Sequence, residues 1–309
     1  MKRILVTGSS GFIGNELCQQ YSDLGYKFIG IDLVKNSRNR DLHSHILDCK
    51  DKKALENLKS DFDPETVIHL AARTDLLGKS LADYSDNTVG TQNILEVFSK
   101  SRIIVASSRL VFDPHKKEPL DKFEYSPTTE YGKSKVLAEI MARKYDATIV
   151  RPTSIWGPNS GPPFSTLAKL ISKNLYFRAK KKDIIKTMGF VSNTSAQLRA
   201  ISESEDTSIP INLGDEDLNL NTFADIISYG LHKKNCKELP FRILESVALV
   251  GDYLEYLRID PILNSKRLQN IYNSNTYDLN EVHRICGYPK ITFENAIEKY
   301  VQFLKNSEE

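Results

Sequence analysis

Three glycines, Gly8, Gly11 and Gly14, lie at a G-x-x-G-x-x-G spacing between two segments of different character. Residues 3–7 are a short apolar run that predicts a buried strand, and residues 12–24 have the apolar periodicity of a helix. Glycine is needed where a backbone must turn tightly and approach a pyrophosphate without a Cβ in the way. The phosphates would lie at the helix N-terminus, where unpaired N–H groups favour negative charge. The spacing therefore predicts a dinucleotide site in preference to an ordinary glycine turn.

The alternation of strand and helix continues along the chain and predicts the fold class. Further strands are expected at 28–32, 66–70, 102–106 and 147–151, with helices at 52–60, 87–99 and 129–145. Short apolar strands separated by helices form a parallel sheet covered on both faces. We therefore expect an α/β fold in which a Rossmann-type doubly wound domain occupies residues 1–155.

The regular alternation of strands and helices ends after residue 151, where prolines and glycines are frequent. Helices are expected at 165–173, 222–233 and 293–305, with a strand at 209–213. These elements predict a smaller, mixed α/β C-terminal lobe over residues 156–309 that mainly binds substrate. A return segment near 189–214 is expected to belong to the first domain.

Composition excludes several classes of protein. The 309 residues carry a net charge of +2 with 27% charged and 40% hydrophobic residues, as in a soluble globular protein, so no nucleic-acid partner is expected. No apolar run approaches the roughly 20 residues of a membrane helix, so no membrane insertion is expected. The cysteines, at 18, 49, 236 and 286, are scattered without a C-x-x-C pair. This pattern predicts no metal site and no disulfide framework, and it suits a reducing cytoplasm.

The residue that ends the second predicted strand bears on the type of cofactor. Asp32 follows the glycines at the distance where an acidic residue can hydrogen-bond the ribose hydroxyls of NAD and repel the extra phosphate of NADP. We therefore expect NAD. Two alternatives stay open, since Lys35, Arg38 and Arg40 follow and could accommodate a phosphate, and since an aspartate here could simply begin a turn.

A second motif, Tyr131-Gly132-Lys133-Ser134-Lys135, places a phenol and an ammonium four residues apart. On a helix these side chains share a face, and the positive charge lowers the pKa of the phenol, which can then act as a general acid/base. The spacing is also common on exposed helices. It gains weight from the preceding strand, which ends in Ser107 and Ser108, because open α/β sheets bind ligands at the carboxyl ends of their strands.

Together these motifs resemble the extended short-chain dehydrogenase/reductase family, in its NAD-dependent nucleotide-sugar epimerase/dehydratase branch. The resemblance spans nearly the whole chain. Its matching segments are 7–14 (T-G-x-x-G-x-x-G), 69–72 (H-x-A-A), 87–91 (N-x-x-G-T), 107–112 (S-S-x-x-V-Y), 131–135 (Y-x-x-x-K), 151–158 (R-P-x-x-x-Y-G-P), 211–214 and 286–289.

The resemblance implies roles for individual residues. Tyr131 would be the acid/base, Lys135 would bind the nicotinamide ribose, Ser108 would polarise the reacting oxygen, and Asn87 would support the active-site helix. Cofactor contacts are implied for Gly8, Ser10, Gly11, Phe12, Ile13, Gly14, Asp32, Leu33, Asp48, Cys49, Leu70, Ala71, Ala72, Tyr131, Lys135 and Pro152. Substrate contacts are expected from Arg73, Ser108, Lys186 and Arg258.

Departures from the family's patterns narrow the reaction. The 4,6-dehydratases carry an Asp-Glu pair where this chain has Arg109 and Leu110, and no cysteine lies between Cys49 and Cys236 to serve a Cys/His epimerase-reductase. Phe112 and Trp156 replace tyrosines and leave the sugar and nucleotide open. The expected function is an NAD-dependent 4-epimerase acting on a nucleotide-diphosphate sugar, a small-molecule substrate.

Several alternatives stay open. They are an NAD(P)-dependent keto-sugar reductase, a reductase of some other substrate, and a catalytically idle NAD-binding regulatory protein. The basic run 178–182 could attract a diphosphate or be solvated loop charge. The resemblance also implies a place in polysaccharide biosynthesis and a homodimer, formed by helices that start near Asn87 and Thr129.

Overall fold

The computed structural model describes residues 2–35, 44–180, 183–204, 210–257, 259, 261 and 263–307. The chain forms two compact units. The first comprises Met1–Ile155, Gly189–Asp215 and Tyr277–Lys290, and the second comprises Trp156–Met188, Glu216–Thr276 and Ile291–Glu309.

The first unit is built on a seven-stranded sheet in which every pairing is parallel. Its strand order is β10-β6-β5-β4-β1-β2-β3, with bounds β1 Arg3–Thr7, β2 Lys27–Asp32, β3 Ser44–Ile46, β4 Thr66–His69, β5 Arg102–Ala106, β6 Thr148–Pro152 and β10 Ile211–Leu213. The strand order reverses between β1 and β4, where doubly wound sheets bind their ligands. The expected Rossmann-type α/β fold is confirmed.

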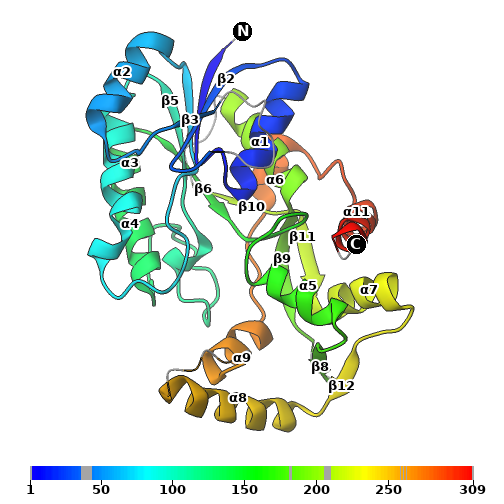
Figure 1. Ribbon diagram of the computed structural model, residues 1–309. Helices are drawn as coiled ribbons and strands as arrows, with labels where there is room; N and C mark the ends of the chain where they lie inside the picture. The colour runs from blue at the N-terminus through cyan, green and yellow to red at the C-terminus, as the bar shows by residue number, and fades with distance from the viewer. Residues whose placement is uncertain are drawn as a thin grey trace. The chain divides into compact units, whose positions relative to one another are not determined.

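Helices cover both faces of this sheet (Figure 1). One face carries α1 Phe12–Asp23, α6 Val191–Glu203 and α10 Asn280–Cys286, and the other carries α2 Lys52–Phe62, α3 Ser85–Val97 and α4 Glu130–Lys144. Successive strand residues point to opposite faces, so Ile4 and Val6 pack with Leu17 of α1, whereas Leu5 packs with Ile94 of α3. The central strands β1, β4 and β5 are therefore apolar on both sides, as the sequence pattern predicted.

Residues Tyr277–Lys290 lie in the first unit, although the sequence analysis assigned them to the C-terminal lobe. The physical reason is the burial of Val282, which is fully enclosed in the same apolar cluster as Leu198 and Ile211. A short amphipathic helix such as α10 carries little sequence information about which sheet it covers.

The second unit contains small sheets and five helices among its described residues. A three-stranded sheet has the order β11-β9-β7 and a two-stranded one joins β12 to β8, with bounds β7 Ser154–Trp156, β8 Phe177–Ala179, β9 Ile185–Phe190, β11 Glu216–Asn219 and β12 Lys237–Leu239. The helices are α5 Phe164–Ser172, α7 Leu220–His232, α8 Phe241–Tyr256, α9 Ser265–Tyr272 and α11 Phe293–Asn306. The buried indole of Trp156 packs against the rings of Phe223 and Tyr300, which gives this unit its own core.

No helix within the described ranges combines the length and the apolar character needed to cross a bilayer. Among the same residues, no group of three or more histidine, cysteine or acidic side chains is placed to hold a metal ion.

A fully buried ion pair joins α4 to β6. The guanidinium of Arg151 donates to Glu139 from Nε at 2.8 Å and from Nη2 at 2.6 Å, and both side chains are completely enclosed. Tyr125 donates its hydroxyl to the same carboxylate at 2.9 Å, and Arg151 also lies over the ring of Phe112. Because neither charge can reach water, each depends on the other.

Removal of one partner should therefore destabilise the first unit strongly. We expect Arg151→Met to lower the free energy of unfolding by about 3–5 kcal/mol, since the buried Glu139 carboxylate loses the guanidinium that donates to both of its oxygens. Denaturant titration measures this loss. The double variant Arg151→Met/Glu139→Met should recover part of it, and a single-variant loss below about 1 kcal/mol would contradict the assignment.

Candidate functional site

The glycine loop between β1 and α1 can be formed only with glycine at two positions. Gly8 has a φ of +70°, and a Cβ there would lie 2.7 Å from the backbone nitrogen of Ala71. A Cβ on Gly14 would lie 2.1 Å from the carbonyl oxygen of Gly8, so the first turn of α1 rests directly on the loop. The loop thus lies against the carboxyl ends of β1 and β4.

This loop fits a pyrophosphate. The first N–H groups of a helix have no partner within the helix, and Gly11, which precedes α1, has no side chain with which to cap them. The N-terminal end of α1 therefore offers backbone donors and a positive dipole at the switch point of the sheet. The predicted contacts Ser10, Gly11, Phe12 and Ile13 all belong to this turn.

Asp32 is fixed beside the loop at the end of β2. Its carboxylate accepts the N–H of Ser10 at 2.9 Å and the N–H of Val34 at 3.3 Å. Ser10 in turn donates its hydroxyl to the carbonyl of Val34 at 2.9 Å. A negative charge in this position suits the ribose hydroxyls of NAD and opposes an added phosphate. Leu33, which follows it, is exposed.

The other predicted cofactor contacts lie along the same edge of the sheet. Asp48 accepts the N–H of Lys50 at 2.8 Å in the turn before α2, and Cys49 is buried. Burial raises the pKa of the Cys49 thiol to about 12, so this thiol stays protonated. Residues Leu70, Ala71 and Ala72 directly follow β4, and Pro152 ends β6.

The predicted catalytic residues come together where β5 ends and α4 begins. Thr129 caps α4 by accepting the N–H of Gly132 at 3.0 Å, which places Tyr131 in the first turn of the helix. The side chain of Ser108 lies near that of Tyr131 and acts to lower its pKa. One turn later, Lys135 is buried and donates Nζ to the carbonyl of Ala106, at the end of β5, at 2.9 Å.

The proton affinities of these groups differ from the sequence expectation. Burial raises the pKa of Tyr131, while the side chain of Ser108 and the charge of Arg109 act to lower it. This raised pKa differs from the lowered pKa that the spacing of Tyr131 and Lys135 predicts. Burial lowers the pKa of Lys135 itself to about 8, while the carboxylate of Glu139 raises it.

Asn87 ties α3 to the catalytic helix. Its Nδ2 donates to the carbonyl of Arg73 at 3.0 Å and to Oγ of Ser134 at 2.9 Å, and its Oδ1 accepts the N–H of Arg73 at 2.8 Å. Ser134 donates its hydroxyl to the carbonyl of Tyr131 at 2.6 Å. Both polar atoms of the Asn87 amide thus form hydrogen bonds, which link α3 to the loop after β4 and to α4.

A buried histidine that the sequence analysis did not count among the site residues extends this network. Nδ1 of His69 lies 2.7 Å from Oγ1 of Thr7, and Nε2 lies 3.1 Å from Oγ1 of Thr91. Thr91 donates its hydroxyl to the carbonyl of Asn87, so it accepts from His69, whose proton is therefore on Nε2. Thr7 accepts the N–H of Ala71 and donates to Nδ1. The sequence does give one indication of His69, because a polar residue stands there at the end of an apolar strand.

His69 is held neutral, since burial, and secondly the charge of Lys135, lower its pKa from 6.5 to about 3. The unfolded chain binds a proton at this residue below about pH 6.5 and the folded chain does not, so its contribution to stability is lost as the pH falls from 6.5 towards 3.

The stability of the protein should therefore depend on pH through His69. Between pH 6 and pH 4, His69→Gln should remove a slope of about 1.4 kcal/mol per pH unit from the free energy of unfolding. Urea titrations at several pH values measure this slope. The exposed His45 provides a matched control, His45→Gln, that should leave it unchanged. Equal slopes in His69→Gln and the unaltered chain would contradict a buried neutral histidine.

The predicted substrate contacts are engaged in other interactions. Arg73 forms a bidentate pair with Asp75, at 2.7 and 3.1 Å, and lies over the ring of Tyr84. Lys186, in the second unit, donates Nζ to the carbonyls of Asn270 and Asn273 at 3.1 and 2.8 Å. Their roles as substrate contacts stay predictions.

Three other predictions fall wholly or partly outside the described residues. These concern the substrate contact Arg258, residues 181–182 of the basic run, and Arg38 and Arg40, which could accommodate a phosphate. Within the described part of that run, Arg178 forms ion pairs with Asp225 and Glu238, which neutralise its charge.

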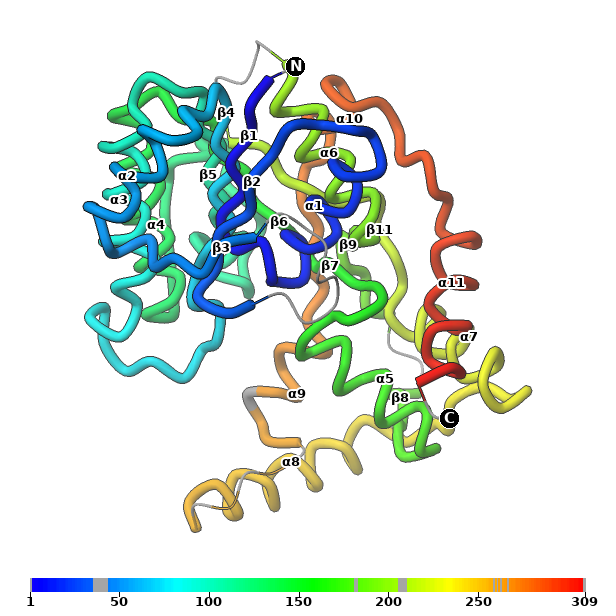
Figure 2. The backbone as a smooth tube through the Cα atoms, turned by 45° about the horizontal axis from the view of Figure 1, so that its top comes forward, coloured from blue at the N-terminus to red at the C-terminus, as the bar shows by residue number. Residues whose placement is uncertain are grey.

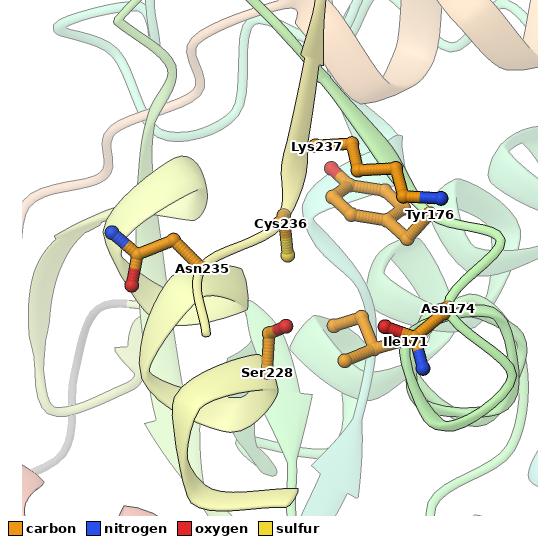
Figure 3. A pocket seen from close by; sticks show the side chains of 7 residues that line it. All are labelled: Ile171, Asn174, Tyr176, Ser228, Asn235, Cys236 and Lys237. Atoms are coloured by element: carbon orange, nitrogen blue, oxygen red, sulfur yellow. The ribbon is translucent and has the colours of Figure 1, made fainter. Parts of the chain in front are cut away.

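A small pocket in the second unit involves none of the predicted site residues. It lies between α5, α7 and β12, and its lining includes Tyr176, Ser228 and Cys236 (Figure 3). Its cavity volume of about 10 Å³ is far below the roughly 300–1,000 Å³ of typical ligand pockets. We do not assign a substrate to it.

The fold and the glycine loop define a dinucleotide-binding Rossmann protein with a serine–tyrosine–lysine group at the edge of its sheet. Residues 4–189 match the NAD dependent epimerase/dehydratase family, and the chain belongs to this family. Its cofactor is NAD, which the geometry of the glycine loop and Asp32 fits.

Individual relatives extend the comparison. The chain is 26% identical to the N-acetyl-alpha-D-glucosaminyl-diphospho-ditrans,octacis-undecaprenol 4-epimerase of Escherichia coli O157:H7, over 97% of this chain and 94% of the relative. It is similar in fold to the UDP-glucuronic acid 4-epimerase of Bacillus cereus, solved with UDP-glucuronic acid and NAD, with a TM-score of 0.74, 20% identity, and 99% of each chain covered. L-threonine dehydrogenase from Clostridium difficile shares the fold with a TM-score of 0.77 and 17% identity, covering 99% of this chain and 98% of that one.

Proposed function

We propose that this chain is an NAD-dependent 4-epimerase of a sugar carried on a diphosphate. The observation that carries the proposal is the meeting of Ser108, Tyr131 and Lys135 at the carboxyl edge of the sheet that also bears the glycine loop. Full-length similarity to a 4-epimerase of a diphosphate-linked sugar supports it.

The chain's own residues perform the proton chemistry in this proposal. The hydroxyl of Tyr131 removes the proton from the sugar hydroxyl and later returns it, while Ser108 hydrogen-bonds the same oxygen. Lys135 would hold the nicotinamide ribose of NAD and Asp32 the other ribose, and the bound cofactor would supply reversible hydride transfer at the sugar carbon. Inversion of the carbon with no net oxidation would then require the hydride to return to the opposite face of the keto carbon, while Tyr131 returns the proton to its oxygen.

Dehydration is not part of this proposal, because Arg109 and Leu110 follow Ser108 where a proton donor and a base would be required. Arg109 instead donates to the hydroxyl of Tyr277 at 3.4 Å within the first unit. Asn87 and its contacts to Ser134 position the first turn of α4, so Asn87 is a positioning residue in this proposal.

Substitution of Tyr131 should affect turnover and leave cofactor binding intact. We expect Tyr131→Phe to lower turnover by about 100-fold or more, because the variant has no hydroxyl to move the proton. NAD binding, measured by titration calorimetry, should stay unchanged. Tyr145→Phe, at the exposed end of the same helix, is the matched control. Unchanged turnover in Tyr131→Phe would refute the assignment.

The substrate can be identified by ligand-dependent stabilisation. A sugar nucleotide present at 100 times its Kd should add about 2.7 kcal/mol to the stability of the NAD-loaded protein. We expect such a shift with at least one UDP-, GDP-, CDP- or dTDP-sugar, or with a sugar on a lipid diphosphate. A hit that is then epimerised without net NADH formation supports the proposal, whereas stoichiometric consumption of NADH or NADPH would identify a reductase instead.

We further propose that the protein is a cytoplasmic homodimer that acts in polysaccharide biosynthesis. Val89 of α3 and the pair Leu137 and Ile140 of α4 are exposed apolar residues on two helices that pack side by side, which suits a four-helix contact between two copies. Analytical ultracentrifugation should show a dimer, and Ile140→Glu should shift it to a monomer.

A further inference from the structure

Helix α8 buries only a narrow stripe of its surface. Leu244, Ala248 and Gly251 are its buried residues, and a Cβ on Gly251 would lie 1.8 Å from the carbonyl oxygen of Leu263. Asn264, which follows, caps α9, and Figure 2 shows α8 running past this helix. The close approach at Gly251 fixes which side of α8 faces its neighbour and which side faces outward.

The outward side of α8 is broadly apolar. Ile243, Val247 and Val250 recur at helical spacing on one stripe, and each is about half exposed, at 45%, 49% and 60%. Leu249, Tyr253 and Tyr256 widen this stripe, and Leu257 and Ile259 continue it beyond the helix end; all five are exposed. Monomeric soluble proteins rarely expose contiguous apolar patches above a few hundred Å², so this outer face of α8 indicates a binding surface.

Two of the three acidic side chains of α8 are turned away from the outer face. Asp252 accepts the N–H of Ser265 at 2.9 Å, and Glu255 accepts Nδ2 of Asn264 at 2.8 Å, so both carboxylates turn towards the start of α9. Glu245 lies far around the helix from Ile243, but it is exposed and lies four residues before Leu249, so it is on the flank of the outer face. Within α8, every residue of which is described, Arg242 and Glu245 are the charged residues left on the outer face.

Exposed cations gather where α8 begins. Lys233, Lys234 and Lys237 precede the helix, and Lys180 lies beside it because its N–H donates to the carbonyl of Leu239 at 2.9 Å. The acidic residue among them, Glu238, forms an ion pair with Arg178. Exposed Lys and Arg side chains near an anionic bilayer are attracted to its surface.

We propose that the outer face of α8 binds the surface of an anionic lipid bilayer, with the helix lying in the interface. The proposal deepens the function proposed above, since a lipid-borne diphosphate sugar is reached at such a surface, and it rests on that function for its biological purpose. Aliphatic side chains enter the acyl boundary, tyrosines suit the interface, and the lysines contact head groups.

A second copy of the chain fits this face less well. Helix pairs associate through a narrow apolar seam flanked by charged residues, whereas Leu249, Tyr253 and Tyr256 flank the stripe of α8. The homodimer proposed above uses α3 and α4, so it does not account for the apolar face of α8.

Vesicle co-sedimentation of the full chain tests the proposal. We expect binding to phosphatidylcholine vesicles that contain 30% phosphatidylglycerol, weaker binding in high salt, and at least ten-fold weaker binding of Val250→Glu/Tyr253→Glu. Leu120→Glu, which changes a fully exposed leucine of the first unit, is the matched control and should bind as the unaltered chain does.

Equal vesicle binding by the double variant and the control, or no binding by the unaltered chain, would overturn the proposal. So would a double variant that changes the sedimentation coefficient of the lipid-free protein, because the face would then belong to a second copy. Turnover of a soluble sugar nucleotide should be the same in both variants. Vesicle binding without any epimerase activity would refute the proposed function and leave the membrane surface supported.

Discussion

The close approach of the first turn of α1 to the glycine loop is the constraint on which the site depends. With only 2.1 Å between the position of a Cβ on Gly14 and the carbonyl oxygen of Gly8, any side chain at Gly14 would push the helix off the sheet. The same contact seats Leu17 and Tyr21 in the core between α1 and the strands. Loop, helix and sheet edge are therefore one packed unit, and the edge that receives a dinucleotide is fixed before any ligand arrives.

Buried charge is the second organising feature of the first unit. Lys135, Glu139 and Arg151 lie in or beside α4 with almost no exposed surface, so two cations share one carboxylate. The ammonium of Lys135 completes its contacts with the carbonyl of Ala106. This arrangement costs desolvation energy, and the low pKa of Lys135 records that cost. The positive charge of Lys135 on α4 is thus balanced by the carbonyl of Ala106 and by the carboxylate of Glu139.

Short sequence patterns predicted those parts of the structure that depend on residues close together in the chain. The apolar runs of β1, β4 and β5, the glycine spacing and the position of Asp32 are short-range signals, and they located the fold and the cofactor edge. The partners of His69 could not be predicted, because Thr7 and Thr91 reach it from another strand and another helix. The exposure of the apolar face of α8 could not be predicted either, because an apolar stripe in the sequence does not show whether another element covers it. The raised pKa of Tyr131 could not be predicted either, because helical spacing does not show how deeply its side chain is buried.

The polarity of the hydrogen bonds around His69 has a consequence for how protons move. The series starts at the amide of Ala71, passes through Thr7, His69 and Thr91, and finishes at the carbonyl of Asn87. Neither terminus can release or take up a proton near neutral pH, so the series cannot conduct one to or from Tyr131. It works instead as a rigid brace between the strand that carries the glycine loop and the helix that bears Asn87.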